Sequence, residues 1–254
     1  MSPVEFAALI AAGFAAGTIN TVVGSGTLVT FPTLLFFGHP PVTANISNSL
    51  GLIPGGLTGS HGYRDELHGH GATLRRRLPM SVAGSAIGAL LLLVLPSAVF
   101  DAVVPVLIGV AVLLVAFGPW LQRQAARRQL DSDGNRRDLA LRASLFVSGV
   151  YGGYFGAAQG VLLVGLMSVL TTEPLQRLNA TKNVLSAAVN LVAALVFVTV
   201  AWHQVNWAVV AAISLGSLVG GYAGAKVGRR LSPPVLRGLI VVIGVGAIAR
   251  IVVA

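Results

Sequence analysis

The sequence predicts an all-α membrane protein built as an inverted repeat of two halves, with about eight to ten membrane segments. Three observations predict this class: a very apolar composition, long apolar stretches between short basic loops, and two glycine-rich segments that align with each other. Of the 254 residues, 55% are hydrophobic and only 10% are charged, and the mean hydropathy is +0.82. Soluble domains carry about 25% charged residues, so lipid is the expected solvent.

Turn residues or charges divide the chain into eight apolar stretches. A membrane helix needs about 20 residues, so short loops leave nearly the whole chain within the bilayer. No basic region precedes the first stretch and no cleavage pattern follows it, so we expect its helix to stay in the mature protein. The stretches are 5–37, 42–60, 76–95, 98–121, 139–170, 174–201, 207–225 and 234–253.

Two of these stretches, 5–37 and 139–170, are too long for one untilted helix. About 32 helical residues reach about 48 Å, whereas the hydrocarbon core is about 30 Å thick. Glycine weakens a helix and proline removes a hydrogen-bond donor, so each stretch is expected to be a broken helix or a helical hairpin. The breaks are predicted near Gly24–Gly26 and near Gln159–Gly160, with Pro32 and Gly156 close by.

The two halves also align with each other. One constant offset pairs Gly26 with Gly160, Pro40 with Pro174 and Asn45 with Asn179. A duplicated half is therefore predicted. Its parts are a first transmembrane repeat at 1–121, a basic linker at 122–138 and a second repeat at 139–254.

Loop charge predicts the orientation, because cytoplasmic loops are rich in Lys and Arg. The linker 122–138 carries five arginines, so it is assigned to the cytoplasm together with Arg75–Arg77. Lys226, Arg229 and Arg230 join them only if 139–170 is broken. Each half then crosses an odd number of times, the second half is inverted, and both termini lie outside.

Composition also excludes several function classes. The net charge of +9 gathers in short loops, as topology requires, so no nucleic-acid partner is expected. The chain has no cysteine, which excludes disulfides and Cys-ligated metals. His61, His68 and His70 lie in a polar loop and are read as solvated side chains, so no metal and no cofactor are expected.

The predicted breaks suggest chemistry for an anion. New half-helices would begin there with free N–H groups and positive dipole ends that replace lost hydration. The alternative is that the glycines only allow close helix packing. The residues predicted to contact the anion are Ser25, Gly26 and Thr27 in one half and Gln159 and Gly160 in the other.

Polar side chains of the following helices would form the walls of this site, namely Asn45, Asn48, Asn179 and Lys182. Polar groups are costly at such depth unless they pair or line a watered cavity, so function is the default hypothesis. Helix-to-helix hydrogen bonding is the alternative for the amides. Lys182 would either neutralise the anion or extend to the headgroups. Carbonyls of broken helices can hold sodium, but nothing in the sequence demands a coupling cation.

The chain resembles the TauE/SafE sulfite exporter family, also called the toluene sulfonate uptake permease family, over almost its whole length. The resemblance rests on the order of VGSGTLVTFPTLL, PPVTANISNSLG, GYRDELHGHGATLRRRLPMSVAGSAIGALL and QVNWAVVAAISLGSLVGGYAGAKVGRRLSPPVLRGLIVVIGV. The glycine runs are interrupted by Ser25 and Thr27 and by Ala157, Ala158 and Gln159. The resemblance implies a multi-pass inner-membrane transporter of sulfite or organosulfonates, without ATP or a cofactor.

The main predicted function is therefore export of a small sulfur-containing anion by a secondary transporter. The alternatives are an uptake permease for sulfonates or small carboxylates, and an intramembrane enzyme with Ser25 as nucleophile and His203 as base. A passive scaffold would need neither paired breaks nor polar faces. The oligomeric state is open, a homodimer being one option.

Overall fold

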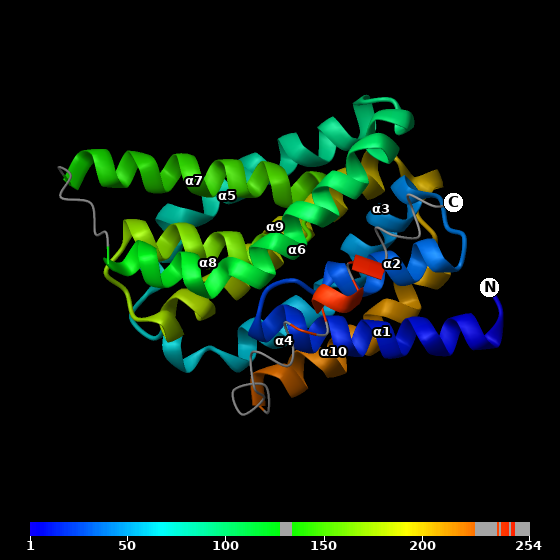
Figure 1. Ribbon diagram of the computed structural model, residues 1–254, viewed down its shortest axis with the longest axis horizontal. Helices are drawn as coiled ribbons and strands as arrows, with labels where there is room; N and C mark the ends of the chain where they lie inside the picture. The colour runs from blue at the N-terminus through cyan, green and yellow to red at the C-terminus, as the bar shows by residue number, and fades with distance from the viewer. Residues whose placement is uncertain (128–133, 227–237, 239, 244, 247–254) are drawn as a thin grey trace.

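The computed structural model describes residues 1–127, 134–226, 238, 240–243 and 245–246. Every element in this part of the chain is helical, and five helices are long and apolar enough to cross a membrane (Figure 1). The predicted all-α membrane class is therefore confirmed. The helices are α1 (Pro3–Val22), α2 (Thr27–Phe36), α3 (Pro41–Gly51), α4 (Ile53–Gly62), α5 (Gly71–Val94), α6 (Ser97–Arg127), α7 (Gly134–Tyr154), α8 (Gln159–Leu170), α9 (Leu175–Val200) and α10 (Trp207–Lys226), with short 3-10 turns at Asp65–Leu67 and Trp202–Gln204.

Both long stretches are broken, as predicted. α1 ends where the N–H groups of Val23 and Gly24 both donate to the Ile19 carbonyl, at 2.7 and 3.0 Å. α7 ends in the same way, with Phe155 and Gly156 both donating to Tyr151 at 3.0 Å. Gly24 and Gly156 have φ angles of +92° and +76°, which glycine adopts without steric cost.

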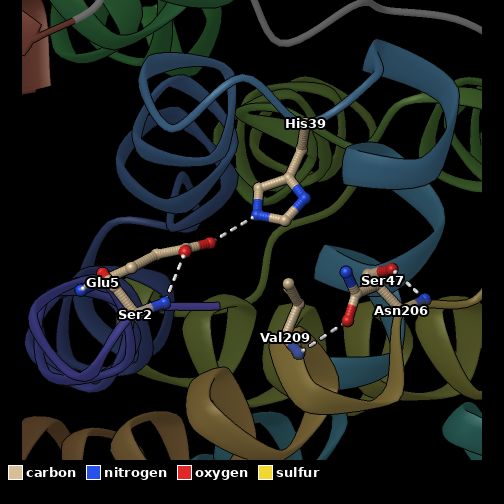
Figure 2. A network of polar contacts seen from close by, with 6 residues as sticks. All are labelled: Ser2, Glu5, His39, Ser47, Asn206 and Val209. Carbon is tan, nitrogen blue, oxygen red and sulfur yellow. Dashed lines mark hydrogen bonds and ion pairs between the residues drawn. The ribbon is translucent and has the colours of Figure 1, made fainter.

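Each pair of half-segments forms a helical hairpin. Ser2 and Glu5 begin α1 with a capping box, and the Glu5 carboxylate then lies 2.8 Å from His39 Nε2, just after α2 (Figure 2). α2 therefore returns to the end of the molecule where α1 started. In the second half, Leu145 of α7 packs with Leu163 and Met167 of α8 in one buried cluster.

The repeat departs from the predicted alignment at two places. Pro40 and Pro174 cap α3 and α9 alike, but Gly24 corresponds in conformation to Gly156, two residues from the predicted register. The shift is absorbed because α8 has 12 residues and α2 has 10. The stretch 42–60 also divides at Leu52 into α3 and α4, whereas α9 is unbroken. Most of 234–253 lies outside the described residues.

Two of the helix pairs that join the halves are built alike. α1 runs alongside α10 with Gly13 against Ile213 and Gly17 against Ser217. α7 runs alongside α5 with Gly149 against Ser81 and Gly153 against Ser85. At each position an added Cβ would enter the backbone of the neighbouring helix. Small residues thus bring the backbones close enough for packing to hold the helices together in lipid.

The basic segments that the structure describes gather at one end. A cavity of about 180 Å³ between α5 and α7 is lined by Arg76, Arg77 and Arg142, so the starts of these helices are neighbours. The end of α10 lies beside the end of α4, where Gly62 contacts Ala225. Within the predicted linker 122–138, α6 continues to Arg127 and α7 begins at Gly134. Arg229 and Arg230 lie outside the described residues.

Candidate functional site

The two helix breaks meet inside the protein. The Gly160 N–H, in the first turn of α8, donates to the Gly24 carbonyl at 3.0 Å. A Cβ added to either glycine would lie 2.5 Å from the Cα of the other. The contact is made by Gly24 and not by Gly26, which packs instead against Ala16 of α1. Phe31 of α2 covers the second break, edge-on to Phe155 at 5.2 Å.

The start of α2 presents a set of free donors. Within the described part of the chain, no acceptor bonds the backbone N–H groups of Ser25, Gly26 or Thr27. The Ser25 side chain is 1% exposed, and its hydroxyl has no partner there. A helix N-terminus also carries the positive end of the dipole, so these groups form a buried site suited to negative charge.

Lys182 of α9 lies beside the same break and does not extend to the headgroups. Its side chain is 0% exposed, and Nζ donates to the carbonyls of Asn20 and Thr21 at 3.0 Å each. These carbonyls belong to the last turn of α1. A Cβ added to Gly160 would lie 2.9 Å from Lys182 Cδ. The lysine therefore ties the end of α1 to α9, and its stem packs against the start of α8.

Two asparagines of α3 bind the breaks from the other side. Asn48 donates to the Thr27 hydroxyl at 3.3 Å and accepts a short hydrogen bond from Thr30. Asn45 donates to the Tyr154 carbonyl at 2.9 Å, in the last turn of α7, while its own side-chain oxygen has no partner among the described residues. Both asparagines are thus at the helix breaks.

Gln159 and Asn179 have no hydrogen bond to the start of α2 among the described residues. Gln159 turns toward α7, where its amide donates to the Ser148 carbonyl at 3.2 Å. Asn179 is half-buried, and no hydrogen bond of its side chain is found in the described regions. Thr30 was missed, although its position one turn after Thr27 was a readable signal. The carbonyls of Asn20 and Thr21 carry no side-chain signal at all.

A sequence model of the sulfite exporter TauE/SafE family matches residues 9–251. The chain belongs to this family. It is 29% identical to a "probable membrane transporter protein" of Haemophilus influenzae, over 97% of this chain and 94% of that one. It is also 27% identical to "probable membrane transporter protein ORF9" of Sinorhizobium, over 96% and 90%, and 26% identical to "probable membrane transporter protein YfcA" of Escherichia coli K12, over 91% and 82%. No solved structure matches.

This TauE/SafE protein is thus a multi-pass membrane transporter of a small molecule. The alternative function, an intramembrane enzyme, would need a base that activates the Ser25 hydroxyl. In the part of the chain that the structure describes, the Ser25 hydroxyl bonds no other side chain.

Proposed function

We propose that this TauE/SafE transporter exports sulfite or a small organosulfonate across the inner membrane of a bacterial-type cell. The observation that carries the proposal is the buried start of α2, where N–H groups and the Ser25 hydroxyl have no partner among the described residues, at the same break whose preceding turn the Lys182 ammonium bonds. Oxyanions need several donors at once when they leave water. The predicted site residues Ser25, Gly26, Thr27, Asn48 and Lys182 supply them; Asn45, Gln159, Gly160 and Asn179 would complete the walls.

The free energy of binding is expected to be small. Backbone donors and one lysine bind an anion less tightly than a buried cluster of arginines, and a carrier must release its cargo.

Flux in proteoliposomes tests the function. We expect saturable transport of labelled sulfite or a small sulfonate that follows an imposed potential, since 100 mV acts on one charge with about 2.3 kcal/mol, or roughly 50-fold in equilibrium distribution. A negative cell interior thereby drives an anion outward without ATP. Absence of saturable flux for every sulfur oxyanion and carboxylate tested contradicts the proposal. Flux that does not change with the potential would instead indicate electroneutral exchange, in which no net charge moves.

The inverted arrangement has its own test. In Figure 1, α1 runs from the N-terminus at the right toward the left, whereas α7 runs from left to right, as two inverted halves would. Because the chain has no cysteine, single cysteines can be placed at will. We expect a membrane-impermeant thiol reagent to label a cysteine at position 2 from outside the cell, and a cysteine in the linker at 131 only after lysis. Labelling of position 2 only after lysis contradicts the inversion.

Replacing Ser25 with alanine should weaken substrate affinity without loss of stability. A hydrogen bond to a charged group contributes about 1.5 kcal/mol or more, so the half-saturation concentration should rise about 10-fold. The midpoint of thermal unfolding should stay unchanged, because the hydroxyl has no partner to lose among the described residues. Ser168→Ala in α8 is the control, since that hydroxyl bonds its own helix at Val164. Equal half-saturation in both variants would exclude Ser25 from the site.

A further inference from the structure

Lys182 has an unusual set of partners for a buried lysine. Buried charges in proteins are normally paired with an opposite charge. Among the described residues, no carboxylate lies within 4.0 Å of the Lys182 nitrogen. Its two hydrogen bonds go to backbone carbonyls, those of Asn20 and Thr21. A simple ion pair therefore does not explain the position of this ammonium.

The two carbonyls belong to a kind of site that binds cations. The last carbonyls of a helix have no partner within the helix, and they carry the negative end of its dipole. α1 stops inside the protein, so Asn20 and Thr21 present this end to a buried space rather than to water. In transporters with interrupted helices, carbonyls of this kind coordinate sodium.

The corresponding place in the second half is neutral. The last turn of α7 is bonded at Tyr154 by the amide of Asn45. A neutral amide thus does for α7 what an ammonium does for α1. Since an amide is a sufficient hydrogen-bond donor there, bonding a helix end does not by itself require the charge of Lys182.

We propose that the C-terminal turn of α1 is a monovalent-cation site that the Lys182 ammonium occupies permanently. The tethered ammonium replaces a dissolved coupling cation at this position. An ammonium has three N–H donors, of which two are used among the described residues, which leaves one for another acceptor. Resting on the proposed function, we infer that the substrate is that acceptor and that one built-in charge suits a monoanion, such as a sulfonate or hydrogen sulfite.

The first test replaces the lysine and offers the vacated site to free cations. Lys182→Ala keeps the carbonyls and opens space, Lys182→Gln keeps a neutral donor, and Lys226→Ala is the control, because Lys226 is exposed beside Tyr222. Each is purified in detergent and unfolded thermally in choline, sodium or methylammonium chloride at equal ionic strength. We expect sodium or methylammonium to raise the midpoint of Lys182→Ala alone, by at least about 3 °C.

The second test measures flux in proteoliposomes containing the same salts. Wild-type flux should be equal in choline and sodium. Lys182→Ala should lose at least about 10-fold in choline and recover in sodium or methylammonium, while Lys182→Gln should lose as much and not recover. Full flux of Lys182→Gln in choline would reduce the lysine to a structural clamp and overturn the proposal. Wild-type flux that requires sodium would overturn it as well.

The two tests separate this inference from the function on which it partly rests. Absence of anion flux in the wild type contradicts the proposed function, whereas the cation dependence of the Lys182→Ala midpoint needs no transport. A Lys182→Ala midpoint that ignores every cation overturns the cation site even if the wild type moves anions. If Lys182→Ala does not fold, the proposal is still tested by two results: wild-type flux that is equal in all salts, and the loss of flux in Lys182→Gln.

Discussion

Gly160→Val is expected to reduce anion flux to the level of empty liposomes. Any Cβ there would lie 2.5 Å from Gly24 Cα and 2.9 Å from Lys182 Cδ. Neither neighbour can yield freely, because one is backbone and the other is a fully buried side chain. The substitution therefore forces the two breaks apart and removes the 3.0 Å hydrogen bond between Gly160 and Gly24. Insertion should persist, because the long helices and their crossings lie elsewhere.

Gly165→Val is the matched control for this experiment. Gly165 lies on the same helix, and nothing lies within 4 Å of an added Cβ. Its flux should stay close to that of the wild type. Size-exclusion profiles and thermal midpoints would show that both variants are folded. Gly26→Val, whose side chain would enter the backbone of α1 at Ala16, is expected to act like Gly160→Val. Normal flux in both Gly26→Val and Gly160→Val would mean that these glycines serve packing alone.

The ion pair of Arg77 and Glu173 should give the largest effect on stability. Arg77 of α5 binds the carboxylate with two nitrogens, at 3.1 and 2.7 Å, and ties α5 to the turn between α8 and α9. The two side chains are only 8% and 16% exposed. Removing one partner of a buried pair leaves an uncompensated charge, which costs about 3 kcal/mol or more. Glu173→Leu should therefore lower the free energy of unfolding by about that amount.

The double variant Arg77→Leu, Glu173→Leu distinguishes the loss of the pair from the burial of a lone charge. It should be more stable than Glu173→Leu, because no unpaired guanidinium remains. The exposed pair of Arg142 and Asp138, with side chains 53% and 57% exposed, is the control. Asp138→Asn should change stability by less than about 1 kcal/mol, since water screens that pair. Equal effects of Glu173→Leu and Asp138→Asn would contradict the view that burial makes the inner pair critical.

Much of the fold followed from local chemistry. Apolar length identified the membrane helices, and the glycines around 24–26 marked the first break correctly, because glycine is needed where φ is positive. The second break was placed a few residues late, since Phe155–Ala158 carries only one glycine and Ala158 itself has a φ of +57°. The division at Leu52 was also missed, although Pro54 stands beside it.

The sequence by itself determined a helical membrane protein with two interrupted helices and polar faces, because hydropathy, helix breakers and polar residues act through local energies. Its transport function followed from the family resemblance. Only the tertiary structure decided which glycines touch and which carbonyls Lys182 binds. Gly24, and not Gly26, meets Gly160, since a contact depends on the angle between two helices far apart in the chain. Lys182 bonds Asn20 and Thr21 through backbone atoms that every residue has. No residue type in the sequence indicates a backbone partner of this kind, and only the folded structure brings the lysine and the carbonyls together.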